Sequence, residues 1–288
     1  MTPERKNSSA SLTIAICTYN RAELLKDCLN SIANQPSVGI EWSVLVVDNN
    51  STDETQTVCD EFVDQFFLFR VVVEKQQGLS YARNRAVAES SSEWIAFIDD
   101  DAILTDQWLK TAEEEIVKNR FDAIGGPYFA WHRSVSPPRW FKDCWESVTP
   151  NQPSGTEMIE GFPTGGNCLI KRTWCQKVPF ATHLGMVENK IAYGEETLFF
   201  STIRSLGASI GWNNSLSIQH YVRPEKYQIC WRFKDAFSRG RDNVSVQNSN
   251  ASIQRLFYRI AITPILFALY GWRLLKGRVT RRQLFLTD

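Results

Sequence analysis

The first 120 residues alternate short apolar runs with segments of helical character, and this alternation limits the possible fold more than any other feature. Residues 24–32 place apolar side chains on one helical face, and residues 78–89 also indicate a helix. Strand–helix–strand spacing is typical of an α/β fold, with a mainly parallel sheet flanked by helices. Ligands of such sheets bind beyond the carboxyl ends of the strands. Strands are predicted over residues 12–17, 42–47, 66–73 and 94–98.

Two helix starts are predicted from capping pairs. Asn20 precedes Glu23 by three residues, and Ser51 precedes Glu54 by the same spacing. In this arrangement each side chain of the pair bonds to the backbone of the other residue. We therefore expect helices to begin just after Asn20 and just after Ser51.

The chain changes character beyond residue 122. Gly, Pro and aromatic residues dominate residues 125–153, which indicates loops and short segments laid over the sheet edge. Further strands are predicted over 162–171 and near Ile210 and Ile218, and a helix over 195–206. We expect a flexible lead-in (1–10), a domain (11–225) with halves 11–120 and 121–225, and a helical, basic C-terminal extension (226–288).

Charge and cysteine content narrow the choice of partners. Lys plus Arg equals Asp plus Glu at 32 each, so no overall field draws the protein to nucleic acid, and no nucleic-acid partner is expected. The seven cysteines include no C-x-x-C pair, which argues against a zinc site or a disulfide framework. Reduced thiols in a cytoplasmic compartment are the simplest interpretation.

Three consecutive carboxylates, Asp99, Asp100 and Asp101, directly follow the predicted strand 94–98. Clustered oxygen ligands at a strand end suit a hard divalent cation, which can in turn hold phosphates. The alternative is a solvated turn, because Asp is common in turns and at helix starts. The triplet alone leaves both interpretations open.

Six motifs carry a resemblance to a known family. They are IAICTYNR, VLVVDNNSTDET, GLSYARNRA, WIAFIDDDA, GGNCLIKR and GEETLFFSTIRSLG, and together they span about residues 12–220. In their order and spacing they resemble the inverting family 2 glycosyltransferases, which have the GT-A fold. Two positions depart from the family pattern: Gln76 stands where many relatives have Asn, and Glu196 where most have Asp.

The resemblance implies a nucleotide-sugar site in the half 11–120. Thr18, Tyr19 and Asn20 would lie against the base and ribose, and Asp48 would accept hydrogen bonds from the base. The alternative for Asp48 is a turn at a helix start. Arg83 resembles the family's nucleotide-contacting arginine, and pairing with an aspartate of the triplet is an alternative that can hold at the same time.

Two further residues would meet the donor sugar. Gly166 would let the backbone approach the sugar closely, and the Asn167 amide would serve its hydroxyls. The alternative for this segment is a turn before a strand. The aromatic stretch 128–145 could stack on acceptor sugars, or could pack in the core or in a lid.

The metal ligands follow from the same resemblance. Asp101 would bind Mg²⁺ or Mn²⁺ directly, Asp99 would serve both the ribose and the metal, and Asp100 is a variable position that could touch the nucleotide. His220 matches a position where some relatives have a metal or diphosphate ligand, and a structural histidine is the alternative.

A catalytic base is implied at the helix start in the half 121–225. Glu196 holds the family's base position, and Glu195 is a competitor because of the Glu-for-Asp departure. The alternative is that both carboxylates only stabilise the helix N-terminus.

The expected activity is therefore transfer of a hexosyl or N-acetylhexosaminyl group from a UDP-linked or other nucleoside-diphosphate sugar, with inversion. The acceptor would be a hydroxyl of a glycan or of a lipid-linked sugar. A noncatalytic nucleotide-sugar-binding subunit of a polysaccharide assembly complex is the alternative. A nucleotidyltransferase is disfavoured, because the first loop, Thr18 to Arg21, lacks glycine.

The C-terminal tail raises a question of membrane contact. Residues 260–272 are nearly uncharged and are followed by a basic cluster, yet they are shorter than the roughly 20 residues that a spanning helix needs. The segment 256–282 could anchor the protein peripherally on the inner face of the cell membrane. Docking on the catalytic domain or burial in a homodimer are the alternatives.

Overall fold

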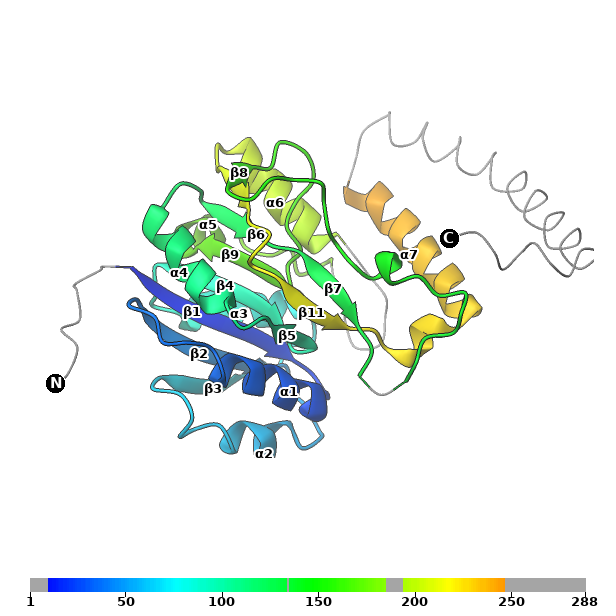
Figure 1. Ribbon diagram of the computed structural model, residues 1–288, viewed down its shortest axis with the longest axis horizontal. Coiled ribbons are helices and arrows are strands. Elements are labelled where there is room, and N and C mark those ends of the chain that lie inside the picture. Colours follow the sequence, from blue (N-terminus) through cyan, green and yellow to red (C-terminus); the bar gives the residue numbers. More distant parts are fainter. Residues whose placement is uncertain (1–9, 134, 185–193, 247–288) are drawn as a thin grey trace, which may run out of the picture. The chain divides into compact units, whose positions relative to one another are not determined.

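The fold is an α/β arrangement built on a twisted eight-stranded sheet (Figure 1). The computed structural model describes residues 10–133, 135–184 and 194–246. The strand order is β3-β2-β1-β4-β9-β6-β10-β8. The strands are β1 Ser11–Thr18, β2 Glu41–Asp48, β3 Phe69–Val73, β4 Trp94–Asp99, β6 Ala123–Gly125, β8 Thr156–Glu157, β9 Asn167–Lys171 and β10 Ile210–Trp212.

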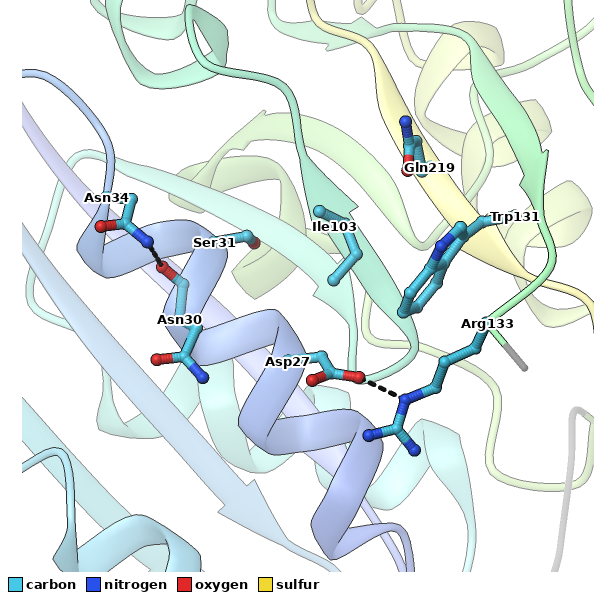
Figure 2. A pocket seen from close by; sticks show the side chains of 8 residues that line it. All are labelled: Asp27, Asn30, Ser31, Asn34, Ile103, Trp131, Arg133 and Gln219. Carbon is cyan, nitrogen blue, oxygen red and sulfur yellow. Dashed lines mark hydrogen bonds and ion pairs between the residues drawn. The ribbon is translucent and has the colours of Figure 1, made fainter.

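A second, three-stranded sheet and a set of helices complete the fold. The small sheet has the order β5-β11-β7, and helix α1 lies beside it (Figure 2). Its strands are β5 Ala102–Leu104, β7 Tyr128–Trp131 and β11 Ile218–Tyr221. The helices are α1 Ala22–Ala33, α2 Thr55–Asp60, α3 Leu79–Glu89, α4 Trp108–Lys118, α5 Arg172–Lys177, α6 Glu195–Ser205 and α7 Ile229–Val246, with short 3₁₀ turns η1 Asp143–Trp145 and η2 Pro224–Tyr227.

The first four strands pair in parallel, and this register aligns their carboxyl ends along one edge of the sheet. β3, β2, β1 and β4 pair in parallel, as the alternating sequence predicted. Thr18 is opposite Asp48, and Cys17 is opposite Asp99, so the carboxyl ends of β1, β2 and β4 lie side by side. Apolar side chains that alternate along these strands fill cores on both faces of the sheet. The α/β prediction is confirmed.

Both predicted capping pairs are wrong, because Asp53 supplies the side-chain contact at both helix starts. Neither α1 nor α2 has a side-chain hydrogen bond from its own N-cap residue. The Ala22 N–H instead donates to Asp53 Oδ2 at 3.0 Å, from 31 residues away. Asn20 has a left-handed φ of 51°, and its Oδ1 accepts from the Thr52 N–H at 2.7 Å. The two loops are therefore joined to each other, and Asp53 caps α1 from a loop that is 31 residues away, which a local pattern cannot reveal.

The predicted strand 162–171 is shorter than expected. β9 covers only Asn167–Lys171, and it runs antiparallel to both β4 and β6. The preceding residues, up to Gly166, form a loop whose end meets the tip of β4: the Asp99 N–H donates to the Gly166 carbonyl at 3.2 Å. The antiparallel strand β9 thus brings the loop that ends at Gly166 to the ends of β1 and β4.

A buried ionic cluster ties the start of α7 to the aromatic loop after β7. Glu146 accepts from Lys226 Nζ at 2.6 Å and from Arg232 Nη1 at 2.5 Å. The Arg232 guanidinium also lies 4.9 Å from the ring centre of Phe141. Because Glu146 is buried, it balances two cations in a poorly solvated setting.

Two sequence predictions fall largely outside the described residues, namely the lead-in 1–10 and the membrane-contact segment 256–282. The chain divides into two compact units, residues 1–238 and 239–288. Within the described residues, no helix combines the length and the apolarity needed to cross a bilayer.

We expect Glu146→Ala to lower the free energy of unfolding by about 3 kcal/mol, because it leaves Lys226 and Arg232 buried together without a counter-charge. Urea denaturation measures this, and the exposed Glu225→Ala is the matched control, with a change below about 0.5 kcal/mol. An equally small effect of Glu146→Ala would contradict the assigned role.

The cost of Glu146→Ala should also depend on pH. Burial raises the pKa of Glu146, but Lys226 and Arg232 outweigh burial and hold it below its usual 4.5. The carboxylate's contribution is therefore fully present above about pH 4.5 and fades as the pH falls through the lower folded pKa. The wild-type advantage should shrink in acid.

Candidate active site

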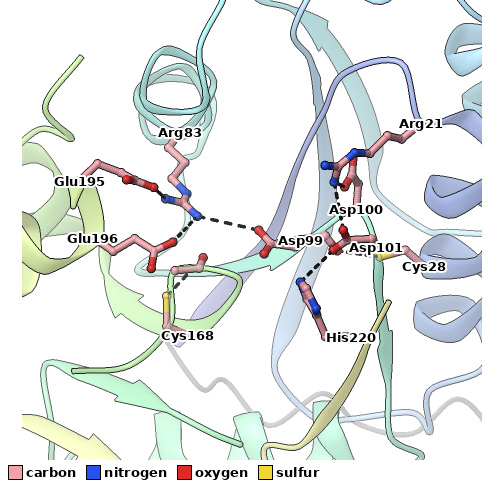
Figure 3. A network of polar contacts seen from close by, with 11 residues as sticks. Arg21, Cys28, Arg83, Asp99, Asp100, Asp101, Cys168, Glu195, Glu196 and His220 are labelled. Atoms are coloured by element: carbon pink, nitrogen blue, oxygen red, sulfur yellow. Dashed lines mark hydrogen bonds and ion pairs between the residues drawn. The ribbon is translucent and has the colours of Figure 1, made fainter. Parts of the chain in front are cut away.

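The aspartate triplet lies at the turn from β4 to β5, and each member has a different environment (Figure 3). Asp99 ends β4, and Asp100 and Asp101 are almost fully buried. Asp100 Oδ2 accepts from Thr18 Oγ1 at 2.8 Å, and Asp100 Oδ1 accepts from Arg21 Nη1 at 2.7 Å. The side chain of Asp100 is thus held by one residue at the end of β1 and one at the start of α1.

Arg21 also fixes the orientation of Asp101. The same Nη1 atom donates to Asp101 Oδ2 at 3.1 Å. The other oxygen, Oδ1, is buried without a hydrogen-bond partner and lies 3.2 Å from His220 Nε2. These two atoms are therefore separated by about the distance expected of neighbouring ligands of one cation. Ligands about 2.1 Å from an octahedral cation lie about 3 Å from one another.

Asp99, Asp101 and His220 together fit a divalent cation. One ligand atom from each of the three lies within 4.8 Å of the others. Burial lowers the pKa of His220, which favours the neutral imidazole that a metal needs. Burial raises the pKa of Asp101, but His220, Arg21 and Lys226 outweigh it and keep that pKa below its usual value. An unpartnered buried carboxylate oxygen is what a bound cation would satisfy.

Arg83 is the centre of a second cluster, which joins α3 to α6. Its buried guanidinium contacts Glu195 Oε1 through Nη1 and Glu196 Oε1 through Nη2, both at 3.1 Å. Nη2 also lies 3.8 Å from Asp99 Oδ1. Arg83, which was expected to contact the nucleotide, thus pairs with both candidate catalytic bases, Glu195 and Glu196, and lies close to Asp99 of the triplet. Arg83 thereby holds the carboxylates of α6 close to Asp99.

The single positive charge of Arg83 faces three carboxylates, those of Asp99, Glu195 and Glu196, so negative charge is in excess around it. Burial, with Glu196 nearby, raises the pKa of Glu195 to about 7. Burial, with Asp101 nearby, raises the pKa of Asp99 to about 7 as well. Protonation of these two groups would reduce the negative charge of the cluster near neutral pH.

Two consecutive glycines make this crowding possible. A Cβ at Gly165 would overlap the Glu196 carboxylate and the Arg83 guanidinium, and a Cβ at Gly166 would overlap the Asp99 carboxylate. We expected this loop to approach a donor sugar closely. In the structure it closely approaches the carboxylates of Asp99 and Glu196.

Asn167 behaves as the turn alternative describes. Its Oδ1 accepts from Trp108 Nε1 at 3.0 Å, and its Nδ2 donates to the carbonyls of Leu216 at 2.7 Å and Pro127 at 3.2 Å. The side chain is fully buried, and its amide is used inside the protein. Asn167 therefore supports the loop, and both polar atoms of its amide already have partners inside the protein.

The remaining nucleotide candidates line the tips of β1 and β2. Asp48 is buried, and its Oδ1 accepts from the Ser51 N–H at 2.9 Å, so it closes a turn as the alternative expected. Tyr19 and Asn20 are more exposed, in the loop after β1, and Asn20 contacts Thr52. Thr18 is buried against Asp100.

Sequence reasoning missed two structural residues of the site. Arg21 stands in the TYNR motif, but its contacts with Asp100 and Asp101 span about 80 positions. Asn49 is buried and donates through Nδ2 to the carbonyls of Glu74 and Gln76, while its Oδ1 accepts from the Gly78 N–H. Asn49 thereby fixes the loop that leads into α3 and Arg83. Its position beside Asp48 at a strand end was the available signal.

Comparison with known proteins gives the family. The sequence model of glycosyl transferase family 2 matches residues 13–178, more than half of the chain. The chain belongs to glycosyl transferase family 2. The matched region contains the triplet, Arg83 and the two glycines, whereas the Glu195-Glu196 pair and His220 lie beyond it.

Curated relatives agree with this membership. Glycosyltransferase AglE of Haloferax volcanii is 34% identical over 116 residues, which are 40% of this chain and 38% of AglE. Succinoglycan biosynthesis protein ExoM of Rhizobium meliloti is 24% identical over 258 residues, which are 89% of this chain and 81% of ExoM. The chain thus spans well under half of AglE but most of ExoM.

Solved structures share the fold. TarS residues 1–349 of S. aureus, in complex with UDP-GlcNAc, has a TM-score of 0.57 at 18% identity, covering 74% of this chain and 59% of that one. The mannosyltransferase PcManGT of Pyrobaculum calidifontis, in complex with GDP-Man and Mn²⁺, has a TM-score of 0.58 at 17% identity, covering 87% and 69%. The family 2 chain therefore has the GT-A fold of these glycosyltransferases.

We expect Glu195→Gln to flatten the pH dependence of stability between pH 5 and 8. A carboxyl whose folded pKa is raised to about 7 contributes stability below its usual 4.5, and this contribution is lost as the pH rises through the folded pKa. Wild-type stability should therefore fall over this range more than that of Glu195→Gln. Urea midpoints in metal-free buffer measure this.

The control for this prediction is Glu114→Gln, a change at an exposed carboxylate of α4. It should keep the wild-type slope. If Glu195→Gln also kept that slope, the raised pKa of Glu195 would be refuted.

Proposed function

We propose that the protein is a metal-dependent inverting glycosyltransferase that moves a sugar from a nucleoside-diphosphate donor, UDP-linked, to a hydroxyl of a glycan or lipid-linked acceptor. The observation that carries the proposal is the buried Asp101 Oδ1, which makes no hydrogen bond and lies 3.2 Å from His220 Nε2, with ligand atoms of Asp99, Asp101 and His220 all within 4.8 Å of one another. The Glu195-Glu196 pair reaches the same edge through Arg83.

The proposed donor site uses the tips of β1, β2 and β4. Thr18, Tyr19 and Asp48 would meet the nucleoside, and Asp99 would meet the ribose. The contacts of Thr18 with Asp100 and of Asp48 with Ser51 keep these groups in fixed positions. The TarS complex with UDP-GlcNAc and the PcManGT complex with GDP-Man support a nucleotide-sugar donor on this fold.

Asp101, Asp99 and His220 would hold Mn²⁺ or Mg²⁺. A nitrogen ligand is more usual for a transition metal than for Mg²⁺, so we favour Mn²⁺. When bound, the cation would neutralise the negative charge that builds on the departing nucleoside diphosphate. Arg21 would keep Asp101 Oδ2 occupied, so that Oδ1 remains directed at the ion.

Glu196 is the proposed base. Its side chain is 33% exposed, whereas that of Glu195 is 6% exposed, so only Glu196 is open to an acceptor. Arg83 fixes the direction of Glu196 through Nη2. In one displacement the acceptor oxygen would bond to the anomeric carbon, the bond to the diphosphate oxygen would break, and the hydroxyl proton would pass to Glu196. Attack from the face opposite the leaving group inverts the anomeric centre.

We expect purified protein with Mn²⁺ to release UDP from a UDP-sugar in the presence of an acceptor, or slowly by hydrolysis. Glu196→Gln should lower kcat by about 10²-fold or more and leave UDP binding nearly unchanged, because the carboxylate acts on the acceptor. Glu114→Gln, at an exposed helix position, should retain wild-type turnover. UDP release measured by a coupled assay tests this.

UDP binding without turnover in any wild-type reaction would point instead to the noncatalytic nucleotide-sugar-binding subunit. No turnover combined with no metal-dependent UDP binding, across all nucleotide-sugar donors, would reject the proposal altogether.

We expect Arg21→Lys to weaken Mn²⁺ binding by about 10- to 100-fold, because the lysine side chain is one bond shorter and cannot place its nitrogen where Nη1 contacts both Asp100 and Asp101. Asp101→Asn should abolish binding at the site. Electron paramagnetic resonance of free Mn²⁺ during titration measures both changes. Arg70→Lys, at an exposed ion pair with Glu89, is the matched control and should bind Mn²⁺ as the wild type does. Wild-type affinity in Arg21→Lys would exclude the positioning role.

A further inference from the structure

The face of the small sheet that points away from His220 carries aromatic side chains. In β7, Phe129 and Trp131 share this face, because side chains alternate along a strand. The register places Gln219 opposite Phe129 and Tyr221 opposite Trp131. Tyr221 and Trp131 pack edge to face, with ring centres 5.9 Å apart. Phe129 is 45% exposed. This face is an aromatic surface open to solvent rather than part of the core.

Helix α1 turns this surface into a groove (Figure 2). The groove has a volume of about 480 Å³, within the range of small-molecule sites. On one side lie the polar side chains of α1, and on the other lie Trp131 and Gln219, with Ile103 at the floor. Asn30 and Asn34 are exposed at the helix surface. The lining residues from α1 are Asp27, Asn30, Ser31 and Asn34.

The charges of the groove are already balanced. Arg133 Nε pairs with Asp27 Oδ2 at 2.6 Å, and Arg133 Nη2 lies 3.4 Å from Glu23 Oε2. Among the described residues that line the groove, Arg133 is the one cation, and it has two carboxylate partners, so these residues offer no surplus positive charge to a phosphate or another anion. The polar rim likewise does not suit an apolar chain.

The chemistry of this groove matches a neutral saccharide. A pyranose ring has apolar C–H faces that pack on an aromatic ring, and a rim of hydroxyls that both donate and accept hydrogen bonds. Amide side chains such as Asn30, Asn34 and Gln219 offer donors and acceptors in one plane. Aromatic surface on one wall and planar polar groups on the other are combined here within one groove.

The groove also lies next to the proposed catalytic edge. The Tyr221 N–H donates to the Asp101 carbonyl at 2.9 Å, so the strand end that carries Tyr221 is attached to the triplet. His220, the neighbouring residue in β11, is directed to the opposite face and the metal ligands. An acceptor of several sugars held in the groove would therefore have to extend around the end of β11 for its terminal hydroxyl to reach the proposed catalytic edge.

We propose that the groove between α1 and the Phe129–Trp131 face binds a neutral oligosaccharide segment of the acceptor, away from the reacting hydroxyl. This inference rests on the proposed glycosyltransferase function for its biological meaning. The binding itself needs neither the metal nor the donor. Acceptors would consequently be recognised over more than one sugar unit, and longer chains would bind more tightly than single sugars.

The test is binding of the full chain to an array of immobilised neutral oligosaccharides of increasing length, followed by calorimetry with the best soluble ligand. Trp131→Ala should weaken binding about tenfold or more, because the stacking surface is lost. Trp131→Tyr should restore most of the affinity. Asn30→Ala, a change on the exposed side of α1, should weaken binding several-fold through one lost hydrogen bond. This second variant carries the test if Trp131→Ala does not fold.

Phe67→Ala is the matched control, because it removes an aromatic ring that is 83% exposed, near the edge strand β3 of the large sheet. It should bind glycans as the wild type does. Absence of wild-type binding to any neutral oligosaccharide would overturn the inference. Equal affinity of the wild type, Trp131→Ala and Asn30→Ala would also overturn it.

A separate titration of the wild type with UDP and Mn²⁺ distinguishes this inference from the proposed function. Glycan binding that depends on Trp131, without any UDP binding, would support the groove and count against the donor site. UDP binding without glycan binding would do the reverse.

Discussion

The charge balance at the tips of β1 and β4 governs the whole site. Five carboxylates meet there, three from the triplet and two from α6, and the guanidinium groups that pair with them are those of Arg21 and Arg83. With every carboxylate ionised, the cluster would have three more negative than positive charges in a largely buried setting. Such an arrangement is costly unless protons or a cation compensate for it. The raised pKa values of Asp99 and Glu195 show the first response, and the Asp99–Asp101–His220 geometry allows the second.

The strand pairing of the large sheet brings these charged side chains together. Parallel pairing of β1, β2 and β4 aligns three strand ends, and the antiparallel β9 brings Gly165 and Gly166 against them. Arg83 then holds α6 in place from α3, across more than a hundred positions of sequence. Removal of either arginine would therefore disturb geometry and charge together. Arg21 and Arg83 thus both position carboxylates, and the nucleotide contact expected of Arg83 stays a prediction.

Much of this architecture was predictable from local patterns. Apolar runs that end in Asp48 and in the triplet indicated buried strands with functional tips, and the α/β fold followed from their spacing. Family resemblance then supplied candidate roles for Glu195, Glu196 and His220. Those roles remain proposals, but the structure does bring His220 to Asp101 and both glutamates to Arg83.

What escaped prediction depends on contacts between distant segments. The capping pairs at Asn20 and Ser51 failed because Asp53 caps α1 from another loop. The role of Arg21 could not be deduced, because its partners are about 80 residues away. Asn167 looked like a free amide beside two glycines, yet it is enclosed by Trp108 and two backbone carbonyls. The groove beside Trp131 likewise exists only once β7, β11 and α1 come together. Its aromatic residues alone could not separate sugar binding from core packing.

The most direct test of the charge balance is anomalous diffraction from crystals of the wild type grown with Mn²⁺ and UDP. We predict one strong manganese peak coordinated by Asp101 and His220, with the diphosphate attached to it and Arg21 still paired with Asp100. A site without manganese in which Arg21 or another protein cation fills the space between Asp99, Asp101 and His220 would contradict the account.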